Sequence, residues 1–163
     1  DMAQLGQFMN RTFTGKVNME KVKAIRDIWK GPLVLKGIAT EEDMEASIQL
    51  GVDGVIVSNH GGRQVDAGES SIVSLMKLAS NPSYKSKLKI MMDGGIRSGV
   101  DLARAHAVGS EFNFMGRPFM YGVGALGEEG GEHTINMFKA HLYQVMQQLT
   151  VDNINQLQDR LIK

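Results

Sequence analysis

The sequence contains no cysteine, only three prolines and no long uninterrupted apolar run. Without cysteine the chain can form no disulfide, no thiolate nucleophile and no cysteine-ligated metal site. None of its apolar runs approaches the roughly 20 residues that a membrane-spanning helix requires. A net charge is also absent, because 18 basic residues balance 18 acidic ones. A neutral chain has no field to hold a polyphosphate backbone, so nucleic acid is not an expected partner.

The length and composition are those of an ordinary folded domain. A chain of 163 residues with 42% hydrophobic and 22% charged residues can bury a sizeable core. We therefore expect residues 1–163 to form a single unit, in which 1–17 is a loop before the first helix and 150–163 is a C-terminal helix. The polar start has no signal-peptide character, and a chain that opens on Asp1 is expected to be processed or cut.

Short apolar runs alternate with segments of helical spacing. Runs rich in β-branched or aromatic residues predict buried strands, and apolar residues three or four apart predict helices. The expected strands are Leu33–Leu35, Val55–Val57, Ile90–Met92 and Phe112–Met115, and the expected helices lie near 19–29, 40–50, 70–79, 99–108 and from 130 onward. Asn18, Thr40 and Asn153 are suitable N-caps, and Gly51 and Gly109 are suitable helix ends. A helix after each strand is typical of a parallel α/β sheet.

The position of the unusual residues distinguishes two α/β architectures. Lys36, Ser58–Gln64, Asp93–Arg97 and Gly116–Pro118 each lie at the end of a predicted strand. In a (β/α)8 TIM barrel the carboxyl ends of the strands meet around one ligand, whereas a Rossmann sheet places a G-x-G-x-x-G motif after its first strand. No such motif occurs at that position. The pattern favours the barrel, and since about eight strands are needed to close one, this chain is predicted to form half a barrel.

The ends of the last two predicted strands are suited to holding a phosphate. Gly94 and Gly95 let the backbone approach an anion, and Arg97 and Arg117 can each donate forked hydrogen bonds. The helices that follow would point their N-termini in the same direction. Turn glycines and surface arginines are the ordinary alternative, but their occurrence at two successive strand ends favours the phosphate site.

The end of the second predicted strand carries a histidine and an arginine three residues apart. His60 can accept a proton near neutral pH, and Arg63 can bind a carboxylate through two hydrogen bonds. A single histidine in a loop is more often structural, but the Gly-Gly-Arg sequence that follows favours a catalytic role. Lys36 is either a side chain that reaches solvent from a barrel rim or a cation aimed at developing negative charge.

Together these segments resemble a known family. The runs Gly31–Ile38 and Val57–Asp66, followed by Asp93–Asp101 and Phe114–Pro118, are similar in order and spacing to the signature of FMN-dependent α-hydroxy acid dehydrogenases and oxidases, the L-lactate dehydrogenase and glycolate oxidase type. S-N-H-G-G-R-Q is specific, whereas D-G-G-I-R and G-R-P recur in other phosphate-binding barrels. The resemblance begins at about residue 16, and it implies the C-terminal half of the barrel, strands 5 to 8 with their helices.

The resemblance implies a role for each candidate residue. His60 would be the catalytic base, Arg63 would hold the substrate carboxylate, and Lys36 would lie near the flavin atoms that gain negative charge. The FMN cofactor would be bound by Lys36, Ser58, Asp93, Gly94, Gly95, Arg97, Gly116 and Arg117. Whether the α-hydrogen leaves as a proton or as a hydride stays open, because both routes use His60.

The implied reaction is oxidation of a short L-2-hydroxy acid to the 2-oxo acid. Oxygen, a quinone or a cytochrome could accept the electrons, the complete enzyme would be a homo-oligomer, and its location would be the cytoplasm or the periphery of the inner membrane. In the family an Asp-Thr-Pro segment of the first half orients the histidine, and this sequence has no such segment. The isolated chain is therefore expected not to turn over substrate without the N-terminal half of the barrel.

Two other interpretations stay open. D-G-G-I-R and G-R-P would also suit another FMN- or phosphate-binding barrel, such as type 2 isopentenyl diphosphate isomerase or a relative of inosinate dehydrogenase. A non-catalytic half-barrel module would need a partner for its exposed strand edges. Asn113 is an unexpected polar residue in a predicted strand. His106, His133 and His141 have no ligand spacing, and no metal is expected.

Overall fold

The computed structural model describes residues 2–12 and 15–162, and the chain divides into two compact units. Unit 1 is Asp1–Gly31 and unit 2 is Pro32–Lys163. The expected single unit is therefore wrong, because average composition does not say where along a chain the contacts concentrate. No helix in the described part of the chain is long and apolar enough to cross a membrane.

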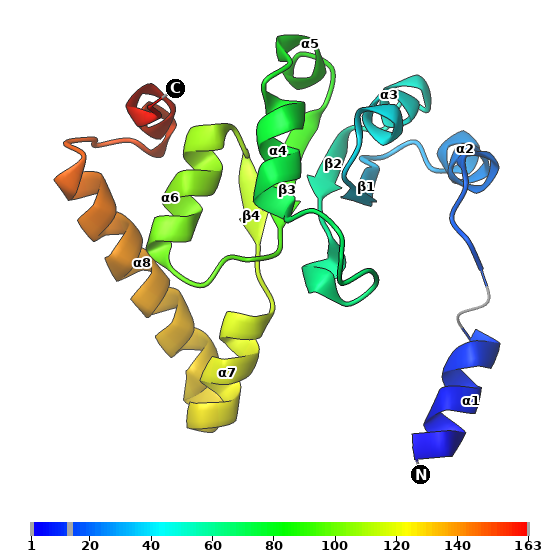
Figure 1. Ribbon diagram of the computed structural model, residues 1–163, viewed down its shortest axis with the longest axis horizontal. Coiled ribbons are helices and arrows are strands. Elements are labelled where there is room, and N and C mark those ends of the chain that lie inside the picture. Colours follow the sequence, from blue (N-terminus) through cyan, green and yellow to red (C-terminus); the bar gives the residue numbers. More distant parts are fainter. Residues whose placement is uncertain (1, 13–14, 163) are drawn as a thin grey trace. The chain divides into compact units, whose positions relative to one another are not determined.

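Unit 1 begins with helix α1 (Met2–Thr12), which lies where a loop over 1–17 was expected (Figure 1). The loop prediction is wrong, because Leu5, Phe8 and Met9 recur at helical spacing and form one side of a helix that precedes the first strand-helix repeat. These three side chains are between 45% and 61% exposed. Within unit 1, α1 therefore presents an apolar stripe to solvent.

The second helix of unit 1, α2 (Met19–Ile28), begins and ends close to its predicted bounds. Asn18 caps it as predicted, accepting a 3.0 Å hydrogen bond from the Lys21 amide. At the other end the Arg26 guanidinium donates to the Trp29 carbonyl, with Nε and O 3.1 Å apart. Side chains thus satisfy backbone groups that the two helix ends would otherwise leave without partners.

Unit 2 is built on a parallel sheet of four strands in the order β1-β2-β3-β4. The strands are β1 (Val34–Ile38), β2 (Gly54–Val57), β3 (Lys89–Asp93) and β4 (Phe112–Phe114). All four predicted strands are confirmed. Because the strands are parallel and neighbours in the chain are neighbours in the sheet, their carboxyl ends share one edge.

Helices follow the strands as predicted. The longer ones are α3 (Glu41–Gln49), α4 (Ser71–Ala79), α6 (Gly99–Val108), α7 (Arg117–Leu126) and α8 (Gly130–Gln148), and the short ones are η1 (His60–Gly62), α5 (Pro82–Lys85), η2 (Gly127–Glu129) and η3 (Ile154–Arg160). The short helices η1, α5 and η2 were not predicted. The expected C-terminal helix over 150–163 is reduced to the 3-10 helix η3.

Several predicted helix boundaries are confirmed. The Thr40 hydroxyl accepts a 3.1 Å hydrogen bond from the Asp43 amide, and Asn153 forms a capping box with Gln156. Gly51 and Gly109 follow their helices with φ of +67° and +122°. Those are conformations that a residue with a side chain rarely adopts. Caps and glycine stops therefore account for where these helices begin and end.

One face of the sheet is covered by helices. α3 contacts β1, α4 contacts β2 and β3, and α6 contacts β4 (Figure 1). Because successive side chains of a strand point to opposite faces, Val55, Val57, Ile90 and Met92 share this side, and none is more than 3% exposed. Burial of these apolar side chains is the main attraction between the sheet and its helices.

The opposite face of the sheet is apolar but largely exposed. The strand register places Val34, Ile56, Met91, Phe112 and Phe114 on this side. Phe112 is 57% and Phe114 40% exposed, and their ring centroids lie 5.0 Å apart. In a closed barrel this face would be the packed interior. An open sheet of four parallel strands with an uncovered apolar face is half of a barrel.

Two close crossings at glycines position the helices around the carboxyl edge. A Cβ at Gly122 of α7 would lie 2.6 Å from the Gly130 carbonyl oxygen, and a Cβ at Gly99 of α6 would lie 2.5 Å from the carbonyl carbon of His141. Only glycine permits backbones to approach so closely. Helix α8 is therefore held directly against the beginning of α6 and the middle of α7.

A further apolar cluster lies among the helices of unit 2. It joins α6, α8 and η3. Its buried members are Ala103, Val151 and Leu157, and Ala107, Leu142, Val145, Met146 and Ile154 pack against them. The C-terminal segment thus braces the helices that follow β3 and β4.

We predict that Asn113→Leu stabilises the protein. Asn113 lies in β4, and its Oδ1 and Nδ2 atoms are buried without a hydrogen-bond partner among the described residues. A buried polar group without a partner costs about 1–3 kcal/mol, so its removal is expected to raise the free energy of unfolding in urea by about 1–2 kcal/mol. Asn136→Leu, at an exposed position of α8, is the control and should change it by less than about 0.5 kcal/mol. Loss of stability in Asn113→Leu would contradict this explanation.

Candidate active site

The carboxyl ends of the four strands surround one cavity of about 560 Å³. A volume of this size is typical of sites for small ligands and cofactors. The cavity is lined by Lys36, His60, Gly61, Arg63, Asp93, Gly94, Gly95, Ile96, Arg97, Met115, Gly116, Arg117, Met120 and Tyr121. Every candidate site residue from the sequence is in this set except Ser58, which lies buried at the end of β2. The structure therefore brings the predicted residues together.

The cavity carries more positive than negative charge. Lys36, Arg63, Arg97 and Arg117 line it, and Asp93 is the carboxylate among the lining residues. Guanidinium groups bind carboxylates and phosphates through pairs of parallel hydrogen bonds. The electrostatics of the cavity therefore suit an anionic ligand.

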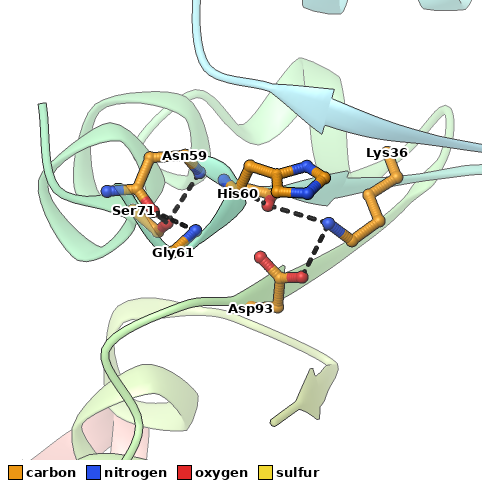
Figure 2. A network of polar contacts seen from close by, with 7 residues as sticks. Lys36, Asn59, His60, Gly61, Ser71 and Asp93 are labelled. Atoms are coloured by element: carbon orange, nitrogen blue, oxygen red, sulfur yellow. Dashed lines mark hydrogen bonds and ion pairs between the residues drawn. The ribbon is translucent and has the colours of Figure 1, made fainter. Parts of the chain in front are cut away.

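Lys36 lies within β1, and its ammonium connects this strand to the ends of β2 and β3. Its Nζ lies 2.8 Å from Oδ2 of Asp93 on β3 and donates a 3.1 Å hydrogen bond to Oγ of Ser58, which follows β2 (Figure 2). The Lys36 side chain is 45% exposed, so this ion pair contributes little to stability but fixes where the ammonium points. The other oxygen of Asp93, Oδ1, is buried without a hydrogen-bond partner among the described residues. Asp93 therefore keeps one acceptor for a ligand that donates a hydrogen bond.

The histidine loop has an unusual backbone conformation. His60, Gly61 and Gly62 have φ of +56°, +67° and +74°, in the left-handed region. Glycine adopts this region readily, whereas a residue with a side chain does so at a cost. Two hydrogen bonds hold the loop, from the His60 amide to Ser58 Oγ and from the Gly61 amide to Asn59 Oδ1, each 3.0 Å long. They leave the His60 side chain exposed at the cavity.

The two predicted phosphate-binding arginines have different partners. Arg117 Nη2 donates a 2.7 Å hydrogen bond to the Gly61 carbonyl, which links the end of β4 to the histidine loop. Arg97 Nη1 donates to the neighbouring Ile96 carbonyl at 2.9 Å. Helix α7 begins at Arg117 with Gly116 as its N-cap. Because glycine has no side chain to cap the helix, the first backbone N–H groups of α7 can face an anion.

Polar residues that the sequence reasoning did not single out support the histidine loop. Ser71, the first residue of α4, is hydrogen-bonded to Asn59, and Asn59 also donates to the Glu69 carbonyl at 3.3 Å. Hydrogen bonds from Lys77 and Ser74 hold the pKa of the Glu69 carboxyl below its ordinary range. Asn59 adjoins the histidine in the sequence and could have been noticed. Ser71 is twelve positions from Asn59, and no sequence signal connects them.

We predict that Gly94→Ala is strongly destabilising. Gly94 has a φ of +89°, and a Cβ there would lie 2.8 Å from Ser71 Oγ and 3.1 Å from Asn59 Oδ1. The left-handed conformation should cost about 1–2 kcal/mol and the collision about 1–3 kcal/mol more, measured as the free energy of unfolding in urea. Gly95→Ala is the matched control, because Gly95 has a φ of +79° but no other atom of the described part of the chain lies within 4 Å of its Cβ position. Equal losses in the two variants would contradict the close packing at Gly94.

Comparisons with known proteins point to one family. A family model described as FMN-dependent dehydrogenase matches residues 1–163. The L-lactate dehydrogenase of Actinobacillus pleuropneumoniae serotype 5b (strain L20) is 38% identical over 139 residues, which are 85% of this chain and 36% of that protein. The L-lactate dehydrogenase of Alcaligenes faecalis is 34% identical over 155 residues, which are 95% of this chain and 40% of that protein.

The fold comparison agrees with the sequence comparison. A solved structure of mandelate oxidase with benzoyl-formic acid matches with a TM-score of 0.82 and 31% identity, over 88% of this chain and 42% of that chain. The chain thus spans only 36% to 42% of the length of these relatives. The predicted half of a (β/α)8 barrel is confirmed. The chain belongs to the FMN-dependent dehydrogenase family.

Proposed function

We propose that this chain supplies the catalytic histidine, the carboxylate-binding arginine and the flavin-phosphate loops of an enzyme that oxidises a short L-2-hydroxy acid to the 2-oxo acid. The observation that carries the proposal is the convergence of Lys36, His60, Arg63, Arg97 and Arg117 on one cavity of about 560 Å³. Lactate and mandelate, which appear in the names of the relatives, are both 2-hydroxy acids. We propose the cytoplasm or the periphery of the inner membrane as the location, and a homo-oligomer as the complete enzyme.

The residues at the ends of β3 and β4 fit FMN. Arg97 and Arg117 are donors for its phosphate. Within residues 2–12 and 15–162, no atom beyond the chain neighbours lies within 4 Å of the Cβ positions of Gly95 and Gly116, so the backbone there is open to a ligand. The buried Oδ1 of Asp93 lacks a partner among the described residues and suits a hydroxyl of the ribityl chain. Ser58 would contribute indirectly, by holding the Lys36 ammonium at 3.1 Å.

Bound FMN would accept the two electrons released when the substrate α-carbon is oxidised. The chain's own contribution near the flavin would be Lys36, whose ammonium is held in place by Asp93 and Ser58 before any ligand arrives. A cation fixed in advance stabilises negative charge that develops on a ligand without the cost of reorienting. That makes Lys36 the electrostatic element of the site.

His60 and Arg63 would handle the substrate. An exposed imidazole at the cavity can take a proton from the substrate onto its free ring nitrogen. Arg63 follows on the same loop, at a distance along the chain that suits a substrate whose carboxylate and hydroxyl are on adjacent carbons. Holding the carboxylate at Arg63 would present the α-carbon and its hydroxyl to His60.

The remainder of the enzyme would pair with the free edges of β1 and β4 and cover the apolar face around Phe112 and Phe114. Residues outside this chain would then complete the site, including a carboxylate that orients His60. The choice among lactate, mandelate and longer 2-hydroxy acids, and among oxygen, a quinone and a cytochrome as electron acceptor, depends on those residues.

We predict that Arg117→Met and Arg97→Met weaken FMN binding more than riboflavin binding. Each arginine would lose charge-assisted hydrogen bonds to the phosphate, so the dissociation constant for FMN should rise about tenfold or more. Titrating flavin with the chain and following flavin fluorescence measures both ligands. Arg104→Met is the control, since Arg104 is 71% exposed on α6 and does not line the cavity. Equal effects on FMN and riboflavin would contradict the phosphate role.

We predict that the isolated chain does not oxidise L-lactate, because half of the site is absent. Joined to the first half of the A. pleuropneumoniae L-lactate dehydrogenase, it should regain turnover. In the joined protein, His60→Gln should lower kcat by about 100-fold or more, and Arg63→Ala should raise the KM for L-lactate. Dye reduction with L-lactate measures both constants, and Arg104→Ala is the control. Ordinary turnover by the isolated chain, or an unchanged KM in Arg63→Ala, would contradict these roles.

A further inference from the structure

We infer that Asn59 and Ser71 are positioning residues that hold the His60 loop in its left-handed conformation and set its place relative to the glycines after β3. We call the Asn59–Ser71 pair the clasp. The functional meaning of the clasp rests on the proposed role of His60. The clasp itself is a property of the chain and can be tested without flavin or substrate.

The His60 loop needs such support because its backbone does not favour the observed conformation. His60 has a φ of +56° although it carries a side chain, and Gly61 continues with a φ of +67°. A residue with a side chain keeps such a conformation only where the surrounding structure enforces it. The Ser58 hydroxyl provides part of the restraint by accepting from the His60 amide, but Ser58 belongs to the same short segment. An anchor outside the segment is therefore needed.

Ser71 provides that anchor through Asn59. The backbone N–H of Asn59 donates to Ser71 Oγ at 3.0 Å, and Ser71 Oγ in turn donates to the side-chain oxygen Oδ1 of Asn59 at 3.2 Å (Figure 2). The same Oδ1 accepts from the Gly61 amide at 3.0 Å. Ser71 is 3% exposed and begins α4, so it is fixed by the packing of that helix on the sheet. A hydroxyl on α4 thus restrains the backbone directly after His60.

A further contact orients the side-chain amide of Asn59. Asn59 Nδ2 donates to the Glu69 carbonyl at 3.3 Å. The Glu69 carboxylate is itself bound to α4, by Ser74 Oγ at 3.0 Å and by Lys77 Nζ at 2.6 Å. Because the donor end of the Asn59 amide is engaged there, its oxygen is left facing Gly61 and Ser71.

The clasp also contacts the loop after β3. A Cβ on Gly94 would lie 2.8 Å from Ser71 Oγ and 3.1 Å from Asn59 Oδ1, so Gly94 packs directly against both residues. Gly94 is a candidate flavin-phosphate residue, and His60 is the candidate base. One pair of side chains therefore fixes the spacing between the two parts of the site.

Neither member of the clasp lines the cavity that holds the candidate catalytic residues. Both line a separate cavity of about 220 Å³ on the side of α4. Asn59 and Ser71 would therefore act on the reaction only through the placement of His60 and Gly94. Ser71→Thr keeps the hydroxyl and adds one methyl group beside this smaller cavity, which makes it a suitable rescue variant.

The experiment compares hydrogen exchange of the Gly61 amide in the 163-residue chain and its variants by NMR. Ser71→Ala should speed that exchange about tenfold and Asn59→Ala at least as much, because the acceptor of the Gly61 amide is loosened or removed. Ser71→Thr should keep the wild-type rate, since the hydroxyl is retained. Ser47→Ala is the control, because Ser47 is an equally buried serine whose hydroxyl bonds within α3. The amides of Val57 and Met92 report whether each variant keeps its fold.

The clasp is supported if Gly61 exchange rises in Ser71→Ala and Asn59→Ala, while Ser71→Thr, Ser47→Ala and the strand amides stay at wild-type rates. Wild-type Gly61 exchange in Ser71→Ala, or faster exchange in Ser71→Thr equal to that in Ser71→Ala, would overturn it. FMN titration of the same samples reports on the proposed function separately. Absence of FMN binding together with the expected exchange pattern would contradict the proposed function and leave the clasp supported. FMN binding together with unchanged Gly61 exchange in the variants would contradict the clasp and leave the proposed function supported.

Discussion

The parallel register of the four strands is the constraint on which the rest of the structure depends. Lys36 and Asp93 are far apart in the chain and separated by β2 in the sheet, yet their charged groups lie 2.8 Å apart. Such contact across a strand is possible because all four strands run in one direction and end at one edge. The helices that pack against one face of the sheet hold that register. The geometry of the candidate site is therefore a consequence of the sheet.

Glycine and serine residues then fix the positions of the helices and of the histidine loop around this sheet. Gly99 and Gly122 allow α8 to meet α6 and α7 at backbone distance, which fixes the helices that begin beside the cavity. Ser58 and Ser71 are both buried, and their hydroxyl groups accept hydrogen bonds from the backbone N–H groups of His60 and Asn59 respectively. Small residues thus do two things here: the glycines permit close approach of backbones, and the serines supply hydrogen bonds that restrain the histidine loop. These glycines and serines support the polar side chains that are exposed at the cavity.

Much of the fold and the candidate site could be predicted from the sequence, because strands, caps and glycine stops are local patterns. The four strands and the cavity residues around His60 and Arg117 follow from such patterns together with one rule, that parallel strand ends converge. The role of Ser71 could not be predicted, since its contact with Asn59 depends on how α4 packs. Helix α1 was not predicted, because the pattern of Leu5, Phe8 and Met9 occurs outside the strand-helix repeat. Asn113 is unusual in the sequence pattern, and the structure adds that its amide is buried without a hydrogen-bond partner among the described residues.

We propose that the loops after β3 and β4 act as one ligand site. The most direct measurement is a titration of the isotope-labelled chain with FMN, followed by NMR at the amides of Gly95 and Arg117. We expect the two amide resonances to shift and saturate together, while the resonance of the Gln147 amide near the end of α8 does not shift. Shifts at only one of the two loops, or saturation at different FMN concentrations, would contradict it.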